Sequence, residues 1–460
     1  MAPLSITRRS LLRTAAAGGL VIPRARAESL RLATFTVEVT PPLGHPLLAG
    51  LYEPALKIED PLYVKGLILL GPEKPAAVVA VDFCEIRTIA YEEWKSAVAE
   101  AAGTDPERVL LTSLHQHDTP ILDTLAQKIL KENGIAGNIC DPAFHTQCVR
   151  KTAQAAREAL RSARAVTHFG TGQAKVDRVA SNRRAELADG KVVFRRNSTT
   201  RDAAVRTAPE GLVDPYLKTL SFWDGQRPLA ALSCYSVHAQ THFGKGGVTS
   251  DFTGLARAKR QQETPGVFQM YAAGCSGDTT VGKYNDGDPK NILLLGERLR
   301  EGMAGAFQKT ERHTLKRLSF RSVPLPLSMN DEGDFAEAAQ KRLLAEKSQR
   351  FQKHSPSAMG LGWRRRAAQG YTIQMPVLDL GGALLVLAPG ETFVQYQLWA
   401  QQMRPDAFVM VLGYGECAPG YIPTRKAVAE GWKEDAWSWS HPEASEEIML
   451  AGLKAALRKE

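Results

Sequence analysis

Short apolar runs rich in β-branched residues recur along most of the chain and alternate with stretches of helical periodicity. Runs bounded by turn-forming residues are typical of buried strands. The strand-like runs are 64–70, 76–82, 108–113, 217–223, 228–237, 267–273, 374–380, 383–388 and 407–412. The helix-like stretches are 91–102, 143–162, 291–308, 335–350, 392–403 and 444–458. This alternation predicts an α/β (α+β) fold with mixed sheets flanked by helices.

The first 27 residues have the features of an export signal. Arg8 and Arg9 form a twin-arginine pair, a mildly apolar stretch follows, and residues 25–27 read Ala-Arg-Ala, an A-x-A cleavage pattern. We therefore expect 1–27 to be a twin-arginine signal peptide and 28–460 to be one domain, located in the periplasm or secreted. Twin-arginine export carries folded proteins, which often means that a cofactor or metal was loaded beforehand.

The basic balance of the chain comes largely from that segment. The formal net charge is +9, and residues 1–27 hold five arginines and no acidic residue, so the rest carries +4. Nucleic acid is therefore not a favoured partner. No run of about 18 apolar residues occurs, which predicts that nothing spans a membrane. The six cysteines are scattered, and two interpretations stay open. Cys140 and Cys148 could form a disulfide, or all six could be buried free thiols.

Several strand-like runs end in residues that can bind metals or move protons. The blocks are "LLTSLHQHDTP", "LSCYSVHAQTHFGKGGVTSDFTG", "YAAGCSGDTT", "LLVLAPGETF" and "VLGYGECAPGYIPT". Loops at strand ends gather catalytic groups on one edge of a sheet in α/β proteins. His115 and His117 are two apart, so on an extended backbone their side chains point the same way. His238 and His242 would share one face of a helical turn.

Taken together, these loops contain the residue types of a catalytic zinc site. Two contribute histidines, and two others contribute Glu391 and Tyr421. Neutral imidazoles and a carboxylate are common zinc ligands, and a zinc ion with an open position polarises carbonyls and lowers the pKa of bound water to about 7. Asp82 and Glu85 are candidates for turn carboxylates or for acceptors that orient a zinc histidine.

The order of these blocks resembles that of the neutral/alkaline (non-lysosomal) ceramidases, zinc amidohydrolases that cleave the N-acyl bond of ceramide. The shared blocks run from "VEVTPPLG" and "EDPLYVKGLIL" through HxH, "SNRR", "VHAQ", "GDTT" and "PGE" to "GYIPT", and so cover nearly all of the chain after residue 27. Each motif is short, and their common order carries the resemblance. It implies a zinc-dependent hydrolase of an N-acylated lipid or related amide.

The resemblance also implies roles for individual residues. The zinc ligands would be His115, His238, Glu391 and Tyr421. His117 would pass a proton to the leaving nitrogen, since the ordinary pKa of histidine suits transfer in both directions. The family arginine after Asn falls on Arg183, which would hold a polar part of the substrate, and Thr280 would be a nucleophile or a hydrogen-bond donor to it.

Three departures from the family bear on its substrate. Threonine stands at position 280 where the family has serine, Gln116 replaces the threonine of His-Thr-His, and the chain ends at Glu460 without the immunoglobulin-like domain of long ceramidases. They leave two alternatives. One is a zinc hydrolase that acts on a more polar ester or acylated sugar, which the basic "WRRR" at 363–366 also favours, and the other is a non-catalytic exported binding protein.

Two surface features are left open by the sequence. The segment 353–371 is basic and glycine-rich, and is expected to be a solvated loop or a lid over a site. A cluster formed by Trp432, Trp437 and Trp439 is expected either to pack internally or to contact a bilayer peripherally.

Overall fold

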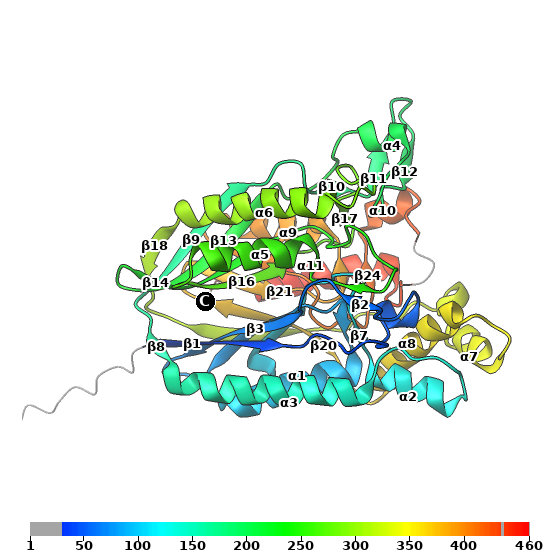
Figure 1. The fold of residues 1–460 in the computed structure, drawn as a ribbon, viewed down its shortest axis with the longest axis horizontal. Helices are drawn as coiled ribbons and strands as arrows, with labels where there is room; N and C mark the ends of the chain where they lie inside the picture. The colour runs from blue at the N-terminus through cyan, green and yellow to red at the C-terminus, as the bar shows by residue number, and fades with distance from the viewer. Residues whose placement is uncertain (1–29, 434–436, 460) are drawn as a thin grey trace, which may run out of the picture.

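The computed structural model describes residues 30–433 and 437–459, so the expected signal peptide at 1–27 lies outside the described residues. Three sheets organise the chain (Figure 1). The first has the order β6 (Val109–Ser113), β4 (Ala76–Val81), β3 (Tyr63–Leu70), β1 (Arg31–Glu38), β8 (Arg164–Ala165). The second has the order β16 (Phe268–Ala273), β14 (Arg227–Tyr235), β13 (Tyr216–Asp224), β9 (His168–Lys175), β18 (Glu311–Thr314). The third has the order β23 (Phe408–Leu412), β21 (Ala383–Leu387), β20 (Ile373–Asp379), β19 (Ser319–Leu325).

The three sheets share one topology. In each, the first two strands are parallel, and the next two continue the sheet antiparallel. Parallel neighbours need a crossover, and a helix supplies it each time, with a second helix beside it. The pairs are α1 (Thr88–Ala102) with α3 (Pro142–Ala159), α5 (Asp251–Glu263) with α6 (Asn291–Gln308), and α9 (Val394–Met403) with α11 (Pro442–Ala456). In Figure 1, α1 and α3 lie below the first sheet and α5 and α6 above the second. One plan is thus used three times in a chain whose sequence shows no internal repeat.

The sheets are buried on both faces. Along β4, Val78 and Ala80 belong to an apolar cluster shared with the second and third sheets, whereas Val79 and Val81 belong to a cluster that also contains α1. Successive side chains of a strand point to opposite faces, so a strand buried on both sides must be apolar throughout. This requirement explains the continuous apolar runs of the sequence.

Shorter elements complete the fold. Five two-stranded pieces pair β5 (Glu85–Ile86) with β7 (Ile121–Leu122), β22 (Glu391–Thr392) with β24 (Tyr421–Ile422), β10 (Ser181–Asn182) with β17 (Thr279–Thr280), β2 (Lys57–Ile58) with β15 (Gly247–Val248), and β11 (Arg184–Glu186) with β12 (Val192–Phe194). The other helices are α2 (Thr124–Glu132), α4 (Ala203–Thr207), α7 (Glu337–Ala345), α8 (Phe351–Ala368), α10 (Arg425–Ala429) and the 3-10 turns η1 (Leu48–Gly50), η2 (Pro106–Arg108), η3 (Leu160–Ser162) and η4 (Gly333–Phe335).

The predicted fold class is confirmed, and one local prediction is wrong. The segment 353–371 is not a loop or lid, because most of it forms α8. This helix buries Met359 and Trp363, and Gly360 lets it approach its neighbours closely, since a Cβ there would lie 2.7 Å from Cδ1 of Trp439. Tertiary packing therefore overrides the low helix propensity of the glycines. Among the described residues, no helix combines the length and apolarity needed to cross a bilayer.

Candidate metal centre

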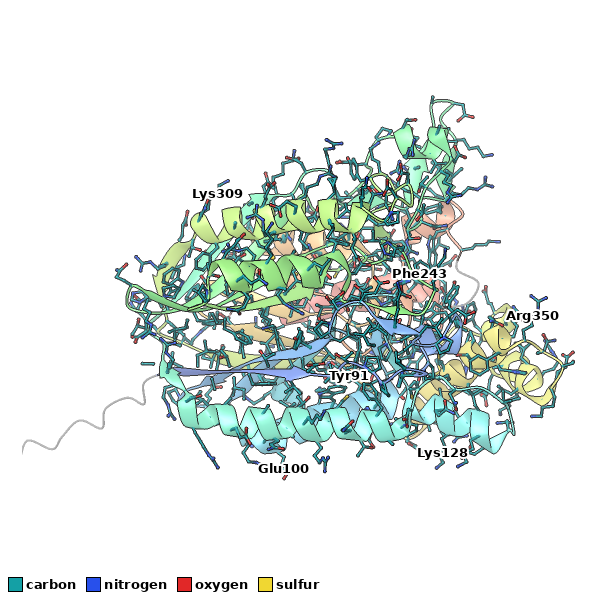
Figure 2. All side chains as sticks on the ribbon, in the orientation of Figure 1. Tyr91, Glu100, Lys128, Phe243, Lys309 and Arg350 are labelled. Atoms are coloured by element: carbon teal, nitrogen blue, oxygen red, sulfur yellow. The ribbon has the colours of Figure 1, made fainter. Side chains whose placement is uncertain are left out.

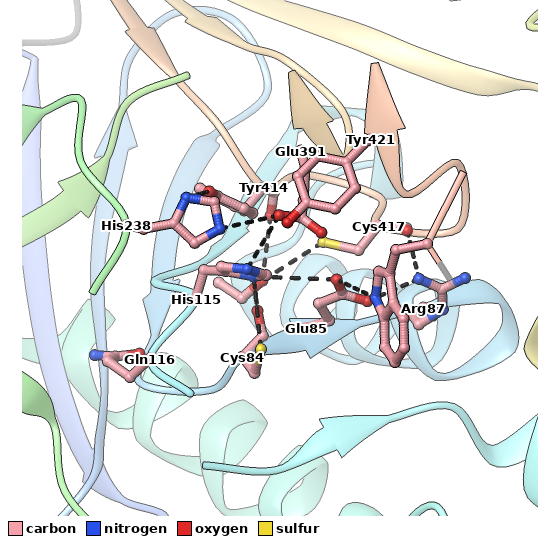
Figure 3. A network of polar contacts seen from close by, with 12 residues as sticks. Cys84, Glu85, Arg87, His115, Gln116, His238, Glu391, Tyr414, Cys417 and Tyr421 are labelled. Carbon is pink, nitrogen blue, oxygen red and sulfur yellow. Dashed lines mark hydrogen bonds and ion pairs between the residues drawn. The ribbon is translucent and has the colours of Figure 1, made fainter. Parts of the chain in front are cut away.

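The three parallel strand pairs direct their carboxyl ends toward one place, where the loops that follow them meet. Three backbone hydrogen bonds join these loops pairwise: Ser113 N–H to the Tyr414 carbonyl (3.0 Å), Gly413 N–H to the Ala273 carbonyl (2.9 Å), and His117 N–H to the Ala239 carbonyl (3.3 Å). The convergence brings together segments more than 300 residues apart in the chain. Carboxyl ends of parallel strands are the usual place for a site in such sheets, and Figure 3 shows the residues gathered here.

His115 enters this centre on a strained backbone. Its N–H donates to the Phe83 carbonyl (3.0 Å), and its φ of 59° is in the left-handed region that non-glycine residues rarely adopt. Nδ1 lies 3.1 Å from the Cys84 carbonyl oxygen, an acceptor only, so Nδ1 carries the proton. The other ring nitrogen, Nε2, then presents a lone pair, and it lies 3.3 Å from Oε2 of Glu391.

His238 is held in the same tautomer from another sheet. Its Nδ1 lies 2.6 Å from the Ser276 carbonyl oxygen and 3.1 Å from that of Thr279, so it donates its proton there. Nε2 again presents a lone pair, 3.0 Å from Oε2 of Glu391. Burial, followed by the nearby Arg183 guanidinium, lowers the pKa of His238 to about 3, so the ring is neutral.

Glu391 and Tyr421 are neighbours because β22 and β24 pair in parallel with these two residues in register. Gly390, just before Glu391, has a φ of 52°, and a Cβ there would lie 2.5 Å from the Gly420 carbonyl oxygen. Only glycine allows this approach of the two loops.

Three hydrogen-bond acceptors therefore converge: Nε2 of His115, Nε2 of His238 and Oε2 of Glu391. The Nδ1 proton of each ring points to a backbone carbonyl, so neither ring places a proton between the three acceptors. Buried acceptors at about 3 Å repel one another unless positive charge lies close to them, and one guanidinium nitrogen of Arg183 lies 3.0 Å from Nε2 of His238. The donor atoms lie within 4.8 Å of one another, and the set of two imidazoles and a carboxylate fits a divalent metal such as zinc.

Arg183 lies between β10 and β11 and faces this cluster. One guanidinium nitrogen donates to the Tyr421 hydroxyl (2.8 Å) and another lies 3.0 Å from Nε2 of His238. The guanidinium also lies 5.3 Å from the centre of the Tyr421 ring. The arginine predicted to bind substrate thus lies next to two of the predicted metal ligands, because its guanidinium contacts both Tyr421 and His238.

His117 lies beside the cluster without taking part in its hydrogen bonds. Its ring is 5.0 Å from that of His115 and 5.7 Å from that of His238, and it packs edge-on against Phe243. Neither ring nitrogen has a hydrogen-bond partner among the described residues. Burial, followed by the neighbouring His115 and His238, lowers the pKa of His117 well below its ordinary value, unlike the unshifted pKa that the sequence suggested.

Tyr414 belongs to this centre although the sequence did not single it out. Its ring stacks on His115 with centroids 4.3 Å apart and planes 16° apart, and its hydroxyl lies 2.7 Å from Oγ of Ser276, the residue whose carbonyl holds His238. Its φ is 54°. A tyrosine between two glycines in "GYG" was the only available signal, since glycines flanking a large residue allow an unusual backbone.

The two carboxylates after β4 have different neighbours. Glu85 lies 4.0 Å from Nδ1 of His115 and 2.7 Å from the fully buried guanidinium of Arg87, so it supports the metal centre from behind. Asp82 does not contact a predicted ligand in this way. It forms a two-pronged ion pair with Arg257, at 2.6 Å for each bond, and accepts a hydrogen bond from Gln116.

Thr280 is buried, and its hydroxyl group bonds to the pocket wall. Oγ1 donates to the Asn197 carbonyl (2.8 Å) and accepts from Nε2 of Gln240 (3.2 Å) and from the Gly282 N–H (3.2 Å). Asn197 and Gln240 both line the pocket described next, whereas Thr280 does not. Its side chain thus lies one layer behind the surface that a substrate would touch.

A pocket of about 480 Å³ opens beside the cluster. Its apolar lining residues are Leu48, Leu51, Tyr52, Phe243 and Trp437, and its other lining residues are Cys84, His115, His117, Arg183, Asn197, Ser198, Gln240, Glu391 and Tyr421. A larger hollow of about 730 Å³ against β9, β13 and β23 is lined by no histidine and shares no residue with it. The chemistry therefore places the candidate site at the smaller pocket.

The remaining predicted features lie outside the metal cluster. His242 is half-buried and is not in the group of converging ligand atoms. Trp432, Trp437 and Trp439 are buried, so they pack internally and do not form an exposed face. The six cysteines are buried free thiols, Cys140 and Cys148 included.

No family model and no curated protein matches the chain. Solved structures do. A crystal structure of neutral ceramidase from Pseudomonas aeruginosa matches with a TM-score of 0.67 and 15% identity, over 93% of this chain and 74% of that one. A structure described as ceramidase complexed with C2 matches with the same score and identity, over 93% of this chain and 75% of that one. The predicted resemblance is thus confirmed at the level of structure, and the chain has a neutral-ceramidase-like fold.

Proposed function

We propose that the protein is a zinc-dependent hydrolase that cleaves an N-acyl amide bond in ceramide or a related N-acylated lipid. His115, His238, Glu391 and Tyr421 would hold the metal. The observation that carries the proposal is the close approach of three acceptors, which are two imidazole lone pairs and one carboxylate oxygen. The N–H protons of both imidazoles point away from this group, toward backbone carbonyls. The neutral-ceramidase-like fold supports the reaction class.

The donor set suits zinc, which accepts imidazole nitrogen and carboxylate oxygen in catalytic sites that keep a position open. Bound there, zinc would polarise a carbonyl and increase the acidity of water. The contacts behind the two histidines match the usual pattern of metal sites, because each ring donates its Nδ1 proton to a backbone carbonyl. Those contacts present Nε2 of both histidines to a metal.

The other residues of the pocket would handle the substrate and its protons. Arg183 would orient an oxygen-bearing group, since guanidinium forms charge-assisted hydrogen bonds at fixed angles. His117 would accept a proton from the attacking water and pass it to the leaving nitrogen. The C–N bond of the amide is then cleaved, and the products are a carboxylic acid and an amine. Its position beside the cluster, with both ring nitrogens unbonded among the described residues, supports this role.

The role predicted for Thr280 can be tested by paired substitutions. Its hydroxyl proton is directed to Asn197, so direct attack or donation to substrate requires that bond to break. Thr280→Val removes the hydroxyl at nearly constant shape, and Thr280→Ser retains it. If Thr280 only supports the wall, we expect a loss of activity of about tenfold or less for valine, whereas a nucleophile would lose on the order of a thousandfold or more.

The pocket lining favours an amphipathic substrate. Leu48, Leu51 and Phe243 offer an apolar wall, while Asn197 and Gln240 offer hydrogen bonds. A lipid amide has both kinds of surface. The polar residues also suit the second candidate, a more polar ester or acylated sugar, and a substrate panel separates the two.

Metal content is the deciding measurement. Plasma mass spectrometry of the purified wild type should find about one zinc per chain, lost in His115→Ala and in His238→Ala. His242→Ala is the matched control, because His242 lies four residues from His238 and outside the ligand group. Wild type that binds no metal when zinc is offered would rule out the proposal. Zinc-loaded protein is then assayed on N-acyl amides beside the corresponding esters.

We also propose twin-arginine export to the periplasm or the medium, on the basis of residues 1–27. Replacement of Arg8 and Arg9 by lysine in the full chain should leave the protein in the cytoplasm. Fractionation followed by immunoblotting measures this, and an unchanged distribution would contradict it.

A further inference from the structure

Exposed apolar side chains gather on one short segment beside the pocket. Of the eight large hydrophobic residues that are exposed among the described residues, four lie between positions 43 and 58. They are Leu43 (64% exposed), Tyr52 (50%), Leu56 (58%) and Ile58 (41%), and together they are called the rim patch. Single exposed leucines are ordinary, but such a concentration marks an interaction surface.

Backbone hydrogen bonds hold the rim patch together. The Gly44 N–H donates to the Ala55 carbonyl (2.8 Å), and the Ala55 N–H donates to the His45 carbonyl (2.9 Å), which places Leu43 beside Leu56. Leu56 N–H donates to the Gly246 carbonyl (2.8 Å), and β2 continues this contact by pairing with β15. The rim patch is therefore displayed by a fixed loop.

The rim patch is continuous with the pocket. Tyr52 belongs to both, and Leu48 and Leu51, on the same segment, line the pocket. The Tyr52 ring packs edge-on against Phe243 at 5.5 Å, and Phe243 packs against His117 at 4.8 Å. Figure 2 labels Phe243 on the side of the molecule where Figure 1 labels β2. An apolar path thus leads from the surface to the residue proposed to move protons.

We infer that the rim patch docks on the apolar layer of a lipid surface and delivers a chain from it to the pocket. This inference rests on the proposed function for its substrate, but the docking itself needs no turnover. Charge does not drive it: Lys57 pairs with Glu59 at 2.8 Å, and Glu53 adds a negative charge between Tyr52 and Leu56. The surface recognised is therefore a zwitterionic lipid layer entered by leucine side chains.

The test is co-sedimentation of the purified protein with phosphatidylcholine vesicles. Leu43→Glu/Leu56→Glu should weaken binding at least about tenfold, because two side chains lose apolar burial. Leu293→Glu/Leu294→Glu is the matched control. It adds the same charge to another pair of exposed leucines, which are 66% and 45% exposed, and should bind as wild type does. Raising the salt from about 0.1 M to about 1 M should change wild-type binding little.

Four outcomes would overturn the inference. The first is a wild type that does not bind vesicles, the second is an equal loss of vesicle binding in both double variants, and the third is binding that high salt abolishes. The fourth is a wild-type dimer that only the Leu43/Leu56 substitutions dissociate, which would make the patch an interface between copies. Activity supplies a separate readout: the Leu43/Leu56 variant should keep its turnover of a water-soluble short-chain amide and lose turnover of amide in vesicles. Vesicle binding without any amide cleavage would instead count against the proposed function alone.

Discussion

The two ends of the three sheets are built in opposite ways. At one end, short turns that are mostly exposed or half-exposed join antiparallel neighbours, at 71–75, 225–226 and 380–382, and their positive-φ residues are Gly225 and Gly381. At the other end, the segments that follow the parallel strands are mostly buried and hold Thr88, His115 and Tyr414 with positive φ. Such residues cost about 1–3 kcal/mol each and persist only where the surroundings enforce them.

Backbone strain is therefore concentrated at the end of the sheets that holds the candidate site. Hairpin turns have only to reverse the chain, and glycine does so with little strain. The opposite loops have to aim His115, His238 and Glu391 at one point, so strained backbone is tolerated there and supported by bonds between sheets. Substitutions at the two ends should therefore differ in kind as well as in size.

The largest effect is expected from Gly390→Ala, at the carboxyl end of the third sheet. A Cβ at 2.5 Å from the Gly420 carbonyl oxygen would push β22 away from β24 and displace Glu391 from Tyr421. We expect zinc affinity to fall about a hundredfold or more and the free energy of unfolding to fall by about 2–4 kcal/mol. Chelator competition and thermal unfolding measure these two quantities, and unchanged zinc affinity would show that the approach of the two loops does not position Glu391.

Tyr414 separates ring stacking from hydrogen bonding at the same end. Tyr414→Ala removes the ring that stacks on His115, and should reduce zinc affinity about 10- to 100-fold. Tyr414→Phe keeps the ring and loses the bond to Ser276, so its zinc affinity should change only a few-fold. Chelator competition on both variants measures the difference, and equal losses would show that the hydroxyl positions the ligands.

Glu416 makes the buried end sensitive to pH. Burial raises its pKa to about 7, above the ordinary value near 4.3, although it accepts hydrogen bonds from Thr88 and Ala418 N–H groups and from the Tyr371 hydroxyl. The folded protein therefore holds this proton more tightly than the unfolded chain. The stability it contributes is complete below about pH 4, falls as pH rises through about 7, and is level above that.

Glu416→Gln imitates the protonated acid and removes this dependence. Relative to wild type, the free energy of unfolding of the variant should rise between about pH 4 and about pH 7. The rise should be a few kcal/mol at most, because one pKa unit corresponds to about 1.4 kcal/mol. Denaturant unfolding at several pH values measures it. Parallel pH profiles for the two proteins would show that Glu416 titrates normally.

The smallest effect is expected from Gly381→Ala, in the turn at the other end of the same sheet. Its φ is 80°, but a Cβ would meet only Cβ of Arg317, at 3.8 Å. The strain should reduce the free energy of unfolding by about 1–2 kcal/mol and leave zinc affinity unchanged. The same two assays serve here, and a loss of zinc affinity would mean that the two ends are coupled.

Sequence patterns predicted the continuously apolar strands and missed β1, β9 and β19, which follow the antiparallel neighbours of the parallel pair in each sheet. β1 reads RLATFTVE, where polar residues that are not buried interrupt the apolar ones, and β9 reads HFGTGQAK, with two glycines and a threonine among its buried positions. β19 is mostly half-buried. Where polar or glycine residues interrupt the apolar run, the local strand signal is weak, and the place of the strand depends on its pairing partners.

The fold class and the residue types of the candidate site could be predicted from local patterns: apolar runs of strand length, and histidine, glutamate and tyrosine directly after them. Three features came from tertiary packing: the ring nitrogens that face Glu391, the stacking of Tyr414 on His115, and the helix that covers most of 353–371. These features depend on contacts between residues hundreds of positions apart. The chain reaches them only when three sheets close on one another, and no local pattern encodes that arrangement.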